Sequence, residues 1–351
     1  MAARIQGLVI GLGKGKQTNI STIGSTFLRL KKLDADSTSP HLVTETDAAE
    51  IGKGHEFGTQ TYPSHYDIAN RVEKYATSEF ATWAISYGLG NVVQTGSTAP
   101  YTYTIVPIDP GTTLELPYFT VVEQLPEGGG FAVDNAFIGC AVEEWLYQFN
   151  YGPGRASSKL TVNWVGSGNG IGTGYNLPSG TPASGITIPA LTTENNMLAA
   201  GMALTVNGVN YVSSGRILSG SCGWKNNLLL NAGFFPGSGT VNGAQVRGRM
   251  EIGTRTPTFN FMIRLVYGSV EYNTLIANAN GTTAPGTATL SVQHDSGNSL
   301  AFNWQRIPFK AVEQGVGDGI VAVTVSTDPQ FDATNGVLSV TSLCSIAGIA
   351  Q

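Results

Sequence analysis

The segment Thr258–Tyr267 has the sequence TFNFMIRLVY, in which large apolar side chains alternate with smaller or polar ones. In an extended chain Phe259, Phe261 and Ile263 fall on one side and Arg264 falls on the other. A period of two residues is typical of a strand that buries one face and leaves the other polar. Antiparallel sheets are commonly exposed on one face in this way, so the segment predicts an antiparallel β protein.

The same alternation recurs from about residue 100 to the C-terminus. Asn207-Gly208 favours a type I′ turn because both positions tolerate positive φ, so Leu204–Val212 is predicted to be a hairpin. The turn-forming segments Tyr151–Gly154 and Asp295–Asn298 each separate two further predicted strands. The other predicted strands are Glu143–Asn150, Lys159–Val165, Thr289–His294, Leu300–Ile307, Ile320–Ser326 and Val337–Ile346.

One helix is predicted over residues 78–88, with Ser78 as its N-cap and two glycines near its end. Phe80, Trp83 and Tyr87 recur on one face of this helix. The aromatic face is expected to cover one sheet rather than to line a ligand pocket.

The chain is predicted to form a single domain of 351 residues. Residues 1–60 are interpreted as an N-terminal arm and long loop, whose order depends on a neighbouring subunit. Residues 61–165 form the first half of the sheets with the helix, and residues 201–351 form the second half with the C-terminal strands. Residues 166–200 are rich in Gly, Ser, Thr and Pro, and predict an insertion loop.

The composition points to a protein whose surface is covered by partners. Charged residues make up 12% of the chain, about half the usual share of about 25%, and glycine accounts for 45 of 351 residues. The net charge of −5 argues against a nucleic-acid binder. The sequence contains no run of about 18 apolar residues, which a membrane-spanning helix would need. The apolar stretch Gly7–Leu12 is too short for a signal peptide. We therefore expect a product of the cytoplasm.

No catalytic, metal-binding or cofactor-binding residues are predicted. His55-Glu56 lacks the second histidine that a zinc site of the HExxH type requires, and Gly11–Thr18 lacks two residues of a phosphate-binding loop. Glu143 and Glu144 are adjacent on a predicted strand, so their side chains point to opposite faces and cannot act as a glycosidase pair. Three widely spaced cysteines, Cys140, Cys222 and Cys344, are predicted to be buried thiols.

Arg247, Arg249 and Arg255, with Glu251 between them, are predicted to lie on one face of a strand. Such a stripe could hold phosphate groups. The intervening Glu251 and the acidic total instead favour salt bridges between subunits or a solvated face. Glu50 is a further candidate for a contact between subunits.

The order of these elements resembles that of the major tail tube proteins of long-tailed, siphovirus-type bacteriophages. The resemblance is one of arrangement and loose motif, spans most of the chain and departs from the pattern at Gly166–Asn196. The segments that carry it are Glu50–Gly52, Asp67–Lys74, Ser78–Tyr87, Tyr101–Pro107, Leu116–Glu123, Gly139–Asn150 and Lys159–Val165.

The resemblance implies a β-sandwich or half-barrel with one flanking helix. It also implies hexameric rings of this subunit that stack into the hollow tail tube of the virion and conduct DNA without binding it specifically. The partners would be further copies of the chain and the tape measure, tail terminator and distal tail proteins, and no cofactor is implied. Assembly would pair the free strand edges of each subunit and order its N-terminal arm.

A secreted or cell-surface β-sandwich, such as an adhesin or carbohydrate-binding module, is the main alternative, because aromatic side chains on strands can stack on sugars. The absence of an export signal and the alternation of most aromatics as a core face stand against it. A β-rich hydrolase lacks a recognisable pair of nucleophile and base, and an outer-membrane barrel lacks repeated aromatic girdles.

Overall fold

The computed structural model is mainly β, with 60% of its residues in strands and 8% in two helices, and its sheets are antiparallel apart from one parallel contact between β15 and β4. This confirms the predicted fold class. The structure describes residues 8–31, 38, 40–46, 60–127, 130–150, 158–168, 186–190, 194–211, 216–235, 240–241, 244–265, 271–281, 284–317 and 320–351.

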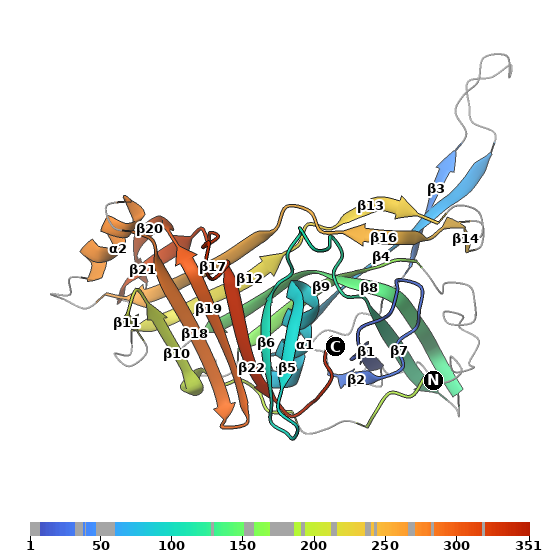
Figure 1. Cartoon of the computed structure of the whole chain (residues 1–351), viewed down its shortest axis with the longest axis horizontal. Coiled ribbons are helices and arrows are strands. Elements are labelled where there is room, and N and C mark those ends of the chain that lie inside the picture. Colours follow the sequence, from blue (N-terminus) through green and yellow to red (C-terminus); the bar gives the residue numbers. More distant parts are fainter. Residues whose placement is uncertain are drawn as a thin grey trace, which may run out of the picture.

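The larger sheet has thirteen strands (Figure 1). Its main path runs through β14 (Thr240–Val241), β15 (Ala244–Gln245), β4 (Thr61–Tyr75), β9 (Lys159–Gly166), β8 (Gly130–Asn150), β12 (Ile217–Lys225), β17 (Thr256–Arg264), β21 (Ile320–Thr327) and β20 (Phe309–Gly317). Four more strands branch from it, β1 (Val9–Gly13), β2 (Phe27–Leu30), β3 (His41–Thr46) and β7 (Phe119–Glu127).

The second sheet has seven strands and packs against part of the first. Its order is β11 (Val209–Asn210), β10 (Met202–Val206), β18 (Gly286–Asp295), β19 (Asn298–Ile307), β22 (Leu338–Cys344), β6 (Tyr101–Pro107) and β5 (Gly90–Thr95). A separate pair joins β13 (Leu229–Phe234) to β16 (Arg247–Glu251), and the helical elements are α1 (Ser78–Leu89), α2 (Glu271–Ala279) and a 3-10 turn (Ala199–Gly201).

Aromatic side chains join the two sheets in the core. Trp145 of β8 stacks on Phe302 of β19 with ring centroids 5.8 Å apart, and Phe259 of β17 lies 5.9 Å from Trp304 of β19. All four side chains are buried, and such pairs contribute about 0.5–1.5 kcal/mol each beyond the burial of their surface. The alternating aromatics of the sequence therefore form the interface of a sandwich, as predicted.

The predicted strands and hairpins are present wherever the structure describes them. Asn207 and Gly208 have φ of 50° and 81° and connect β10 to β11, which is the backbone that a type I′ turn needs. Ser296-Gly297 connects β18 to β19, and β8 pairs with β9. The predicted turn Tyr151–Gly154 and Tyr267 lie outside the described residues.

Helix α1 lies between the two sheets and contacts both of them, whereas the prediction was that its aromatic face covers one sheet. Its residues contact β8 and β12 of the larger sheet and β5, β6, β19 and β22 of the smaller sheet, and every residue except Glu79 is buried. Phe80, Trp83 and Tyr87 are buried as predicted, and Thr82 on another face donates its hydroxyl to Ser78 O, 2.6 Å away.

The N-cap of the helix lies one residue earlier than predicted. Thr77 is the N-cap, with its hydroxyl accepting the Phe80 N–H at 3.3 Å, and Ser78 is the first helical residue. Gly90, with φ of 90°, forms the C-cap.

Residues 8–31 belong to the body of the subunit, contrary to the prediction of an arm that a neighbour must order. β1 pairs with β2 and β7, and Leu12 and Leu30 lie in the core. The backbone oxygen of Gly13 accepts a hydrogen bond of 2.9 Å from the Trp83 indole N–H. These strands show little pattern in the sequence, because they are only five and four residues long and β1 contains two glycines.

The described part of the predicted insertion loop contains no strand. Residues 186–190 and 194–198 run along the body, where Met197 is buried and donates its backbone N–H to Ala76 O at 2.7 Å. Residues 169–185 and 191–193 lie outside the described residues.

Candidate assembly surfaces

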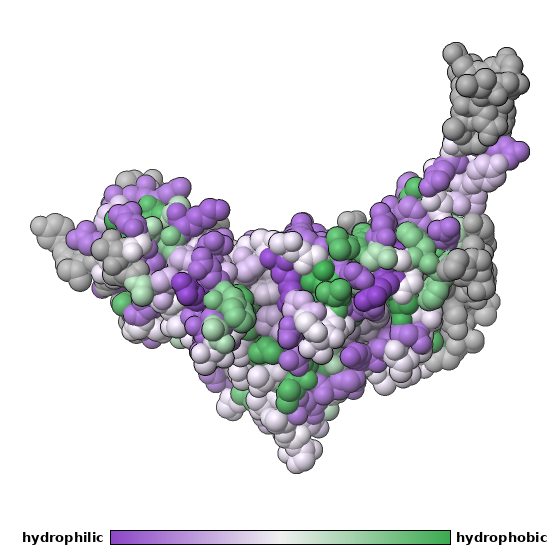
Figure 2. Space-filling view, turned by 45° about the horizontal axis from the view of Figure 1, so that its top comes forward, coloured by the Kyte–Doolittle hydropathy of each residue, from purple (hydrophilic) through white to green (hydrophobic). Residues whose placement is uncertain are grey.

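A two-stranded ribbon projects from the body of the subunit (Figures 1 and 2). It consists of β3 and the first half of β4, residues 41–46 and 61–67, paired from His41↔Asp67 to Thr46↔Thr61. Five of the six residues of β3 are exposed, including Leu42 at 38%, and Tyr62 of β4 is 50% exposed. Both faces of the ribbon are therefore largely open to solvent, and its described surface is mostly polar (Figure 2).

One strand of the ribbon continues into the core, because β4 is a single strand over Thr61–Tyr75. The body therefore sets the direction of the ribbon. β4 leaves the ribbon at Asp67 and joins β9 from Ile68↔Gly166 onward. Ile68 and Val72 of the same strand are buried in the core.

Arg247 stabilises the root of the ribbon, the point at Tyr66 and Asp67 where β4 enters the body. Its side chain is 2% exposed and donates to the backbone oxygens of Tyr66, Gly166 and Leu230 at 2.9, 3.2 and 3.1 Å. It also pairs with the Asp67 carboxylate at 2.5 Å. A guanidinium group can make these bonds together because its five N–H donors point outward in one plane. Arg247 thus joins β4, β9, β13 and β16.

The other residues of the predicted arginine stripe lie in different surroundings. Arg249 is half-exposed and pairs with Glu115 at 2.7 Å and Glu251 at 2.8 Å. Arg255 lies four residues beyond the end of β16, donates to Ile108 O at 2.8 Å and stacks over Trp224. Burial lowers the pKa of Arg255, although the nearby Asp109 opposes this.

The prediction of one arginine face on one strand is therefore wrong. Arg247, Arg249 and Glu251 occupy alternate positions of one strand, β16, but this strand ends at Glu251 and does not include Arg255. Register shifts in the β13–β16 pair also bury Arg247 while Arg249 stays at the surface. The salt bridges found here lie within one chain, and Glu50 lies outside the described residues.

Other surfaces offer strand edges and apolar side chains. Among the described strands, β5 pairs only with β6, and β20 pairs only with β21. Val93 of β5 and Val321 of β21 are exposed, as are Leu229 and Phe235 at the two ends of the β13 segment. An unpaired strand edge beside exposed apolar side chains is a typical place for another chain to bind.

Reactive groups in the described residues are buried rather than gathered in a cleft. Burial raises the pKa of Cys140 and of Cys222, which keeps both as thiols, and the three cysteines are free and buried as predicted. Burial also raises the pKa of Glu143, whose carboxylate accepts the Leu228 N–H at 3.0 Å. Across the ranges that the structure covers, no three His, Cys, Asp or Glu side chains are grouped so as to hold a metal ion.

The predicted separation of Glu143 and Glu144 holds in the structure. Glu144 accepts from the Asn163 side chain at 3.0 Å, on β9, whereas Glu143 turns to the loop before β13.

No protein-family model matches the chain, and no match was found among the curated proteins. Neither helix that the structure describes is long and apolar enough to cross a membrane.

Proposed function

We propose that this chain is the structural subunit of a hollow tail tube in a long-tailed bacteriophage, built by self-assembly into stacked hexameric rings. The observation that carries the proposal is the projecting ribbon of β3 and β4. The mainly β sandwich and the low share of charged residues support it.

The ribbon is energetically incomplete in a single subunit. Isolated two-stranded hairpins are marginally stable in water. Among the described residues a third strand, β15, joins this one only at His65, and five of the six residues of β3 are exposed. Leu42 and Tyr62 lie on opposite faces of the ribbon, because Leu42 pairs with Tyr66 whereas Tyr62 pairs with Glu45. Neighbouring copies that cover both faces would supply the missing burial. Because the ribbon and the surface that receives it are different parts of the chain, the contact does not close on itself in a dimer and can extend a ring or a stack.

In this proposal residues 41–46, which belong to the predicted N-terminal arm and long loop, form one strand of the ribbon and keep the role of bridging subunits. Residues 8–31 complete their own sheet through β1 and β2 and are not free to bridge subunits. In the proposed assembly the contacts between copies therefore include the ribbon and the edges at β5 and β20.

The net charge of −5 suits a tube that conducts DNA without binding it. A wall rich in unpaired lysine and arginine would hold phosphates and slow passage. Arg247 and Arg249 are already paired with carboxylates within the chain. A strongly positive lumen in the assembled tube would contradict this part of the proposal.

Electron microscopy of the purified chain, with sedimentation velocity, tests the proposal. Hollow filaments or stacked rings are expected for the wild type. The double variant Leu42→Ser, Tyr62→Ser should stay folded by circular dichroism but need a concentration at least about tenfold higher to assemble. The matched control is Leu114→Ser, because Leu114 is 39% exposed against 38% for Leu42 and lies away from the ribbon. A wild type that stays monomeric at every concentration overturns the proposal.

A sugar-binding surface protein is the second candidate, favoured by one observation. A cavity of about 510 Å³ is lined by Tyr118 and Phe235 together with polar side chains that include Gln17, Asn19 and Glu115. Aromatic rings beside hydrogen-bonding groups can hold a sugar. Binding of a glycan by a monomeric wild type, lost in Phe235→Ala, would favour this candidate over the tube.

A further inference from the structure

Phe331 is the most exposed large apolar side chain in the described part of the chain, at 69%. It lies on the loop 328–336, which connects β21 to β22. Burying such a side chain is worth about 1.5–3 kcal/mol in general, and aromatic side chains are enriched where proteins contact one another. Its position therefore marks a contact that one subunit does not complete.

The loop holds Phe331 in a fixed setting. The Asp332 carboxylate accepts the backbone N–H groups of Thr334 at 3.0 Å and of Asn335 at 2.9 Å. Asp332 and Gly336 exchange two backbone hydrogen bonds of 2.9 Å. A loop that is ordered before binding loses less conformational entropy on binding, so this one suits an anchor.

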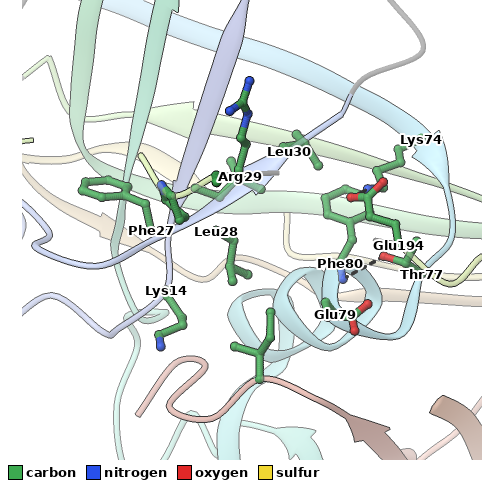
Figure 3. Close-up of a pocket in the computed structure, with 14 residues that line it drawn as sticks. Lys14, Phe27, Leu28, Arg29, Leu30, Lys74, Thr77, Glu79, Phe80 and Glu194 are labelled. Carbon is green, nitrogen blue, oxygen red and sulfur yellow. Dashed lines mark hydrogen bonds and ion pairs between the residues drawn. The ribbon is translucent and has the colours of Figure 1, made fainter. Parts of the chain in front are cut away.

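An apolar pocket of about 230 Å³ lies elsewhere on the same chain, between β1, β2 and the first turn of α1 (Figure 3). Figure 3 shows Leu28 pointing from β2 toward α1, with Phe80 on the helix and the Lys74–Glu194 ion pair beside it. The apolar side chains that line the pocket include Leu12, Phe27, Leu28, Leu30, Phe80, Pro189 and Ile346. Phe331 of the same chain does not fill this pocket, since it is exposed.

The pocket and the loop have opposite charge. Lys14, Arg29 and Lys74 line the pocket and Lys31 pairs with Glu194 at its margin, against two carboxylates, Glu79 and Glu194. Lys14 and Arg29 have no carboxylate partner among the residues that the structure describes. The loop 328–336 carries Asp328 and Asp332 and no basic residue.

One buried oxygen in the pocket also lacks a donor. Glu79 Oε1 accepts from Ser345, whereas Glu79 Oε2 is buried with no partner among the described residues. A buried acceptor of this kind normally has a hydrogen-bond partner. Gln330, next to Phe331 in the loop, carries an amide group that can donate to it.

We propose that the loop 328–336 of one copy docks into this pocket of a second copy, with Phe331 as its anchor. The inference rests on the proposed self-assembly and names one of its contacts. Each copy offers one loop and one pocket, so the contact is head-to-tail and builds a ring or a filament.

Mixing two complementary variants tests the proposal. Phe331→Ser removes the anchor and leaves the pocket, and Leu28→Arg blocks the pocket and leaves the anchor. Each variant alone should associate at least about tenfold more weakly than the wild type. Mixed in equal amounts, the two should form a dimer by sedimentation velocity, because one loop and one pocket remain. Leu114→Ser, an exposed apolar change that lies neither on the loop nor among the residues lining the pocket, is the control and should assemble normally.

A disulfide cross-link tests the contact without a change at Leu28, which is partly buried and whose replacement could unfold the chain. The three native cysteines are buried, so the double variant Lys14→Cys, Phe331→Cys has two accessible thiols near the proposed contact. Oxidation of the assembled protein should give a ladder of covalent oligomers. The control Lys225→Cys, Phe331→Cys, whose first thiol replaces an exposed residue of β12 outside the pocket, should not.

The outcomes separate this inference from the proposed function. Tubes of Phe331→Ser that form at the wild-type concentration, or assembled Lys14→Cys, Phe331→Cys that gives no ladder, overturn the inference and leave the tube subunit standing. A wild type that never assembles overturns the proposed function itself. If Phe331→Ser assembles normally but loses binding to a different protein, Phe331 belongs to another partner and the inference is wrong.

Discussion

Replacing Arg247 by methionine should destabilise the root of the ribbon. The guanidinium group donates to the backbone oxygens of Tyr66, Gly166 and Leu230 and pairs with Asp67. Methionine keeps much of the apolar stem of arginine but offers no donor. The variant therefore removes the hydrogen bonds while it preserves most of the packing.

The magnitude follows from the groups that are left behind. Each of the three backbone oxygens loses a donor, and an unsatisfied buried acceptor costs about 1–3 kcal/mol. This cost applies in full to the buried Gly166 oxygen and in part to the partly buried oxygens of Tyr66 and Leu230. Asp67 is half-exposed and can be solvated by water, so its ion pair adds little. The free energy of unfolding should fall by about 3 kcal/mol, which is roughly a hundredfold in the unfolding equilibrium constant.

Urea denaturation followed by circular dichroism measures the change. The control is Arg249→Met, because the Arg249 side chain is 46% exposed and its pairs with Glu115 and Glu251 are worth less than about 1 kcal/mol. Equal midpoints for the two variants would refute the reasoning, since they would mean that the buried hydrogen bonds of Arg247 contribute no more than a surface salt bridge.

Three further changes test the core. Gly88→Ala places a methyl group 2.4 Å from the Trp145 ring and should lower the free energy of unfolding by about 1–3 kcal/mol in urea, whereas Gly315→Ala, with open space around it, should change it little. Phe259→Ala empties the interface of the two sheets and should cost about 3–5 kcal/mol in the same assay. Burial raises the pKa of Glu143 in the folded state, so folding favours the protonated carboxyl. The stabilisation that protonation gives the folded state is present below the ordinary glutamate pKa and is lost as pH rises through the raised pKa. Glu143→Gln should therefore gain stability relative to the wild type between the ordinary glutamate pKa and neutral pH, and a difference that stays constant with pH would contradict the assignment.

Local chemistry explains which parts of the fold the sequence predicts well. The alternation in Phe259, Phe261 and Ile263 and the Asn207-Gly208 turn each depend on residues that are adjacent in the chain. Both were confirmed. Short strands such as β1 are set instead by distant partners, because β1 is held between β2 and β7 and its own five residues carry little pattern.

The single aromatic face of α1 did not predict that the helix lies between two sheets. The residues away from that face include Ala81, Thr82 and Ser86, which look like a solvent-facing side. They are buried because small side chains allow the second sheet to approach, and the Thr82 and Ser342 hydroxyls lie 2.6 Å apart across that interface. Burial of short polar side chains thus depends on a partner strand more than 250 residues away in the sequence.

Helix α2 and the root of the ribbon were missed for different reasons. Tyr272, Leu275, Ile276 and Ala279 recur with helical spacing, so the signal for α2 was present and went unused. The role of Arg247 had no comparable signal. Its partners come from three other strands, and only the folded sheet brings their backbone oxygens together.

The geometry of β4 links stability to assembly in the proposed tube. One continuous strand, Thr61–Tyr75, forms the ribbon at one end and a core strand at the other, and Arg247 lies where the two meet. A change on the ribbon, such as Tyr62→Ser, should weaken assembly without unfolding the body. A change at Arg247 should weaken both, because it loosens the body and the direction of the ribbon together. Comparing the two variants by urea denaturation and by electron microscopy separates these effects, and an Arg247→Met chain that is destabilised but assembles at the wild-type concentration would show that the direction of the ribbon does not depend on this side chain.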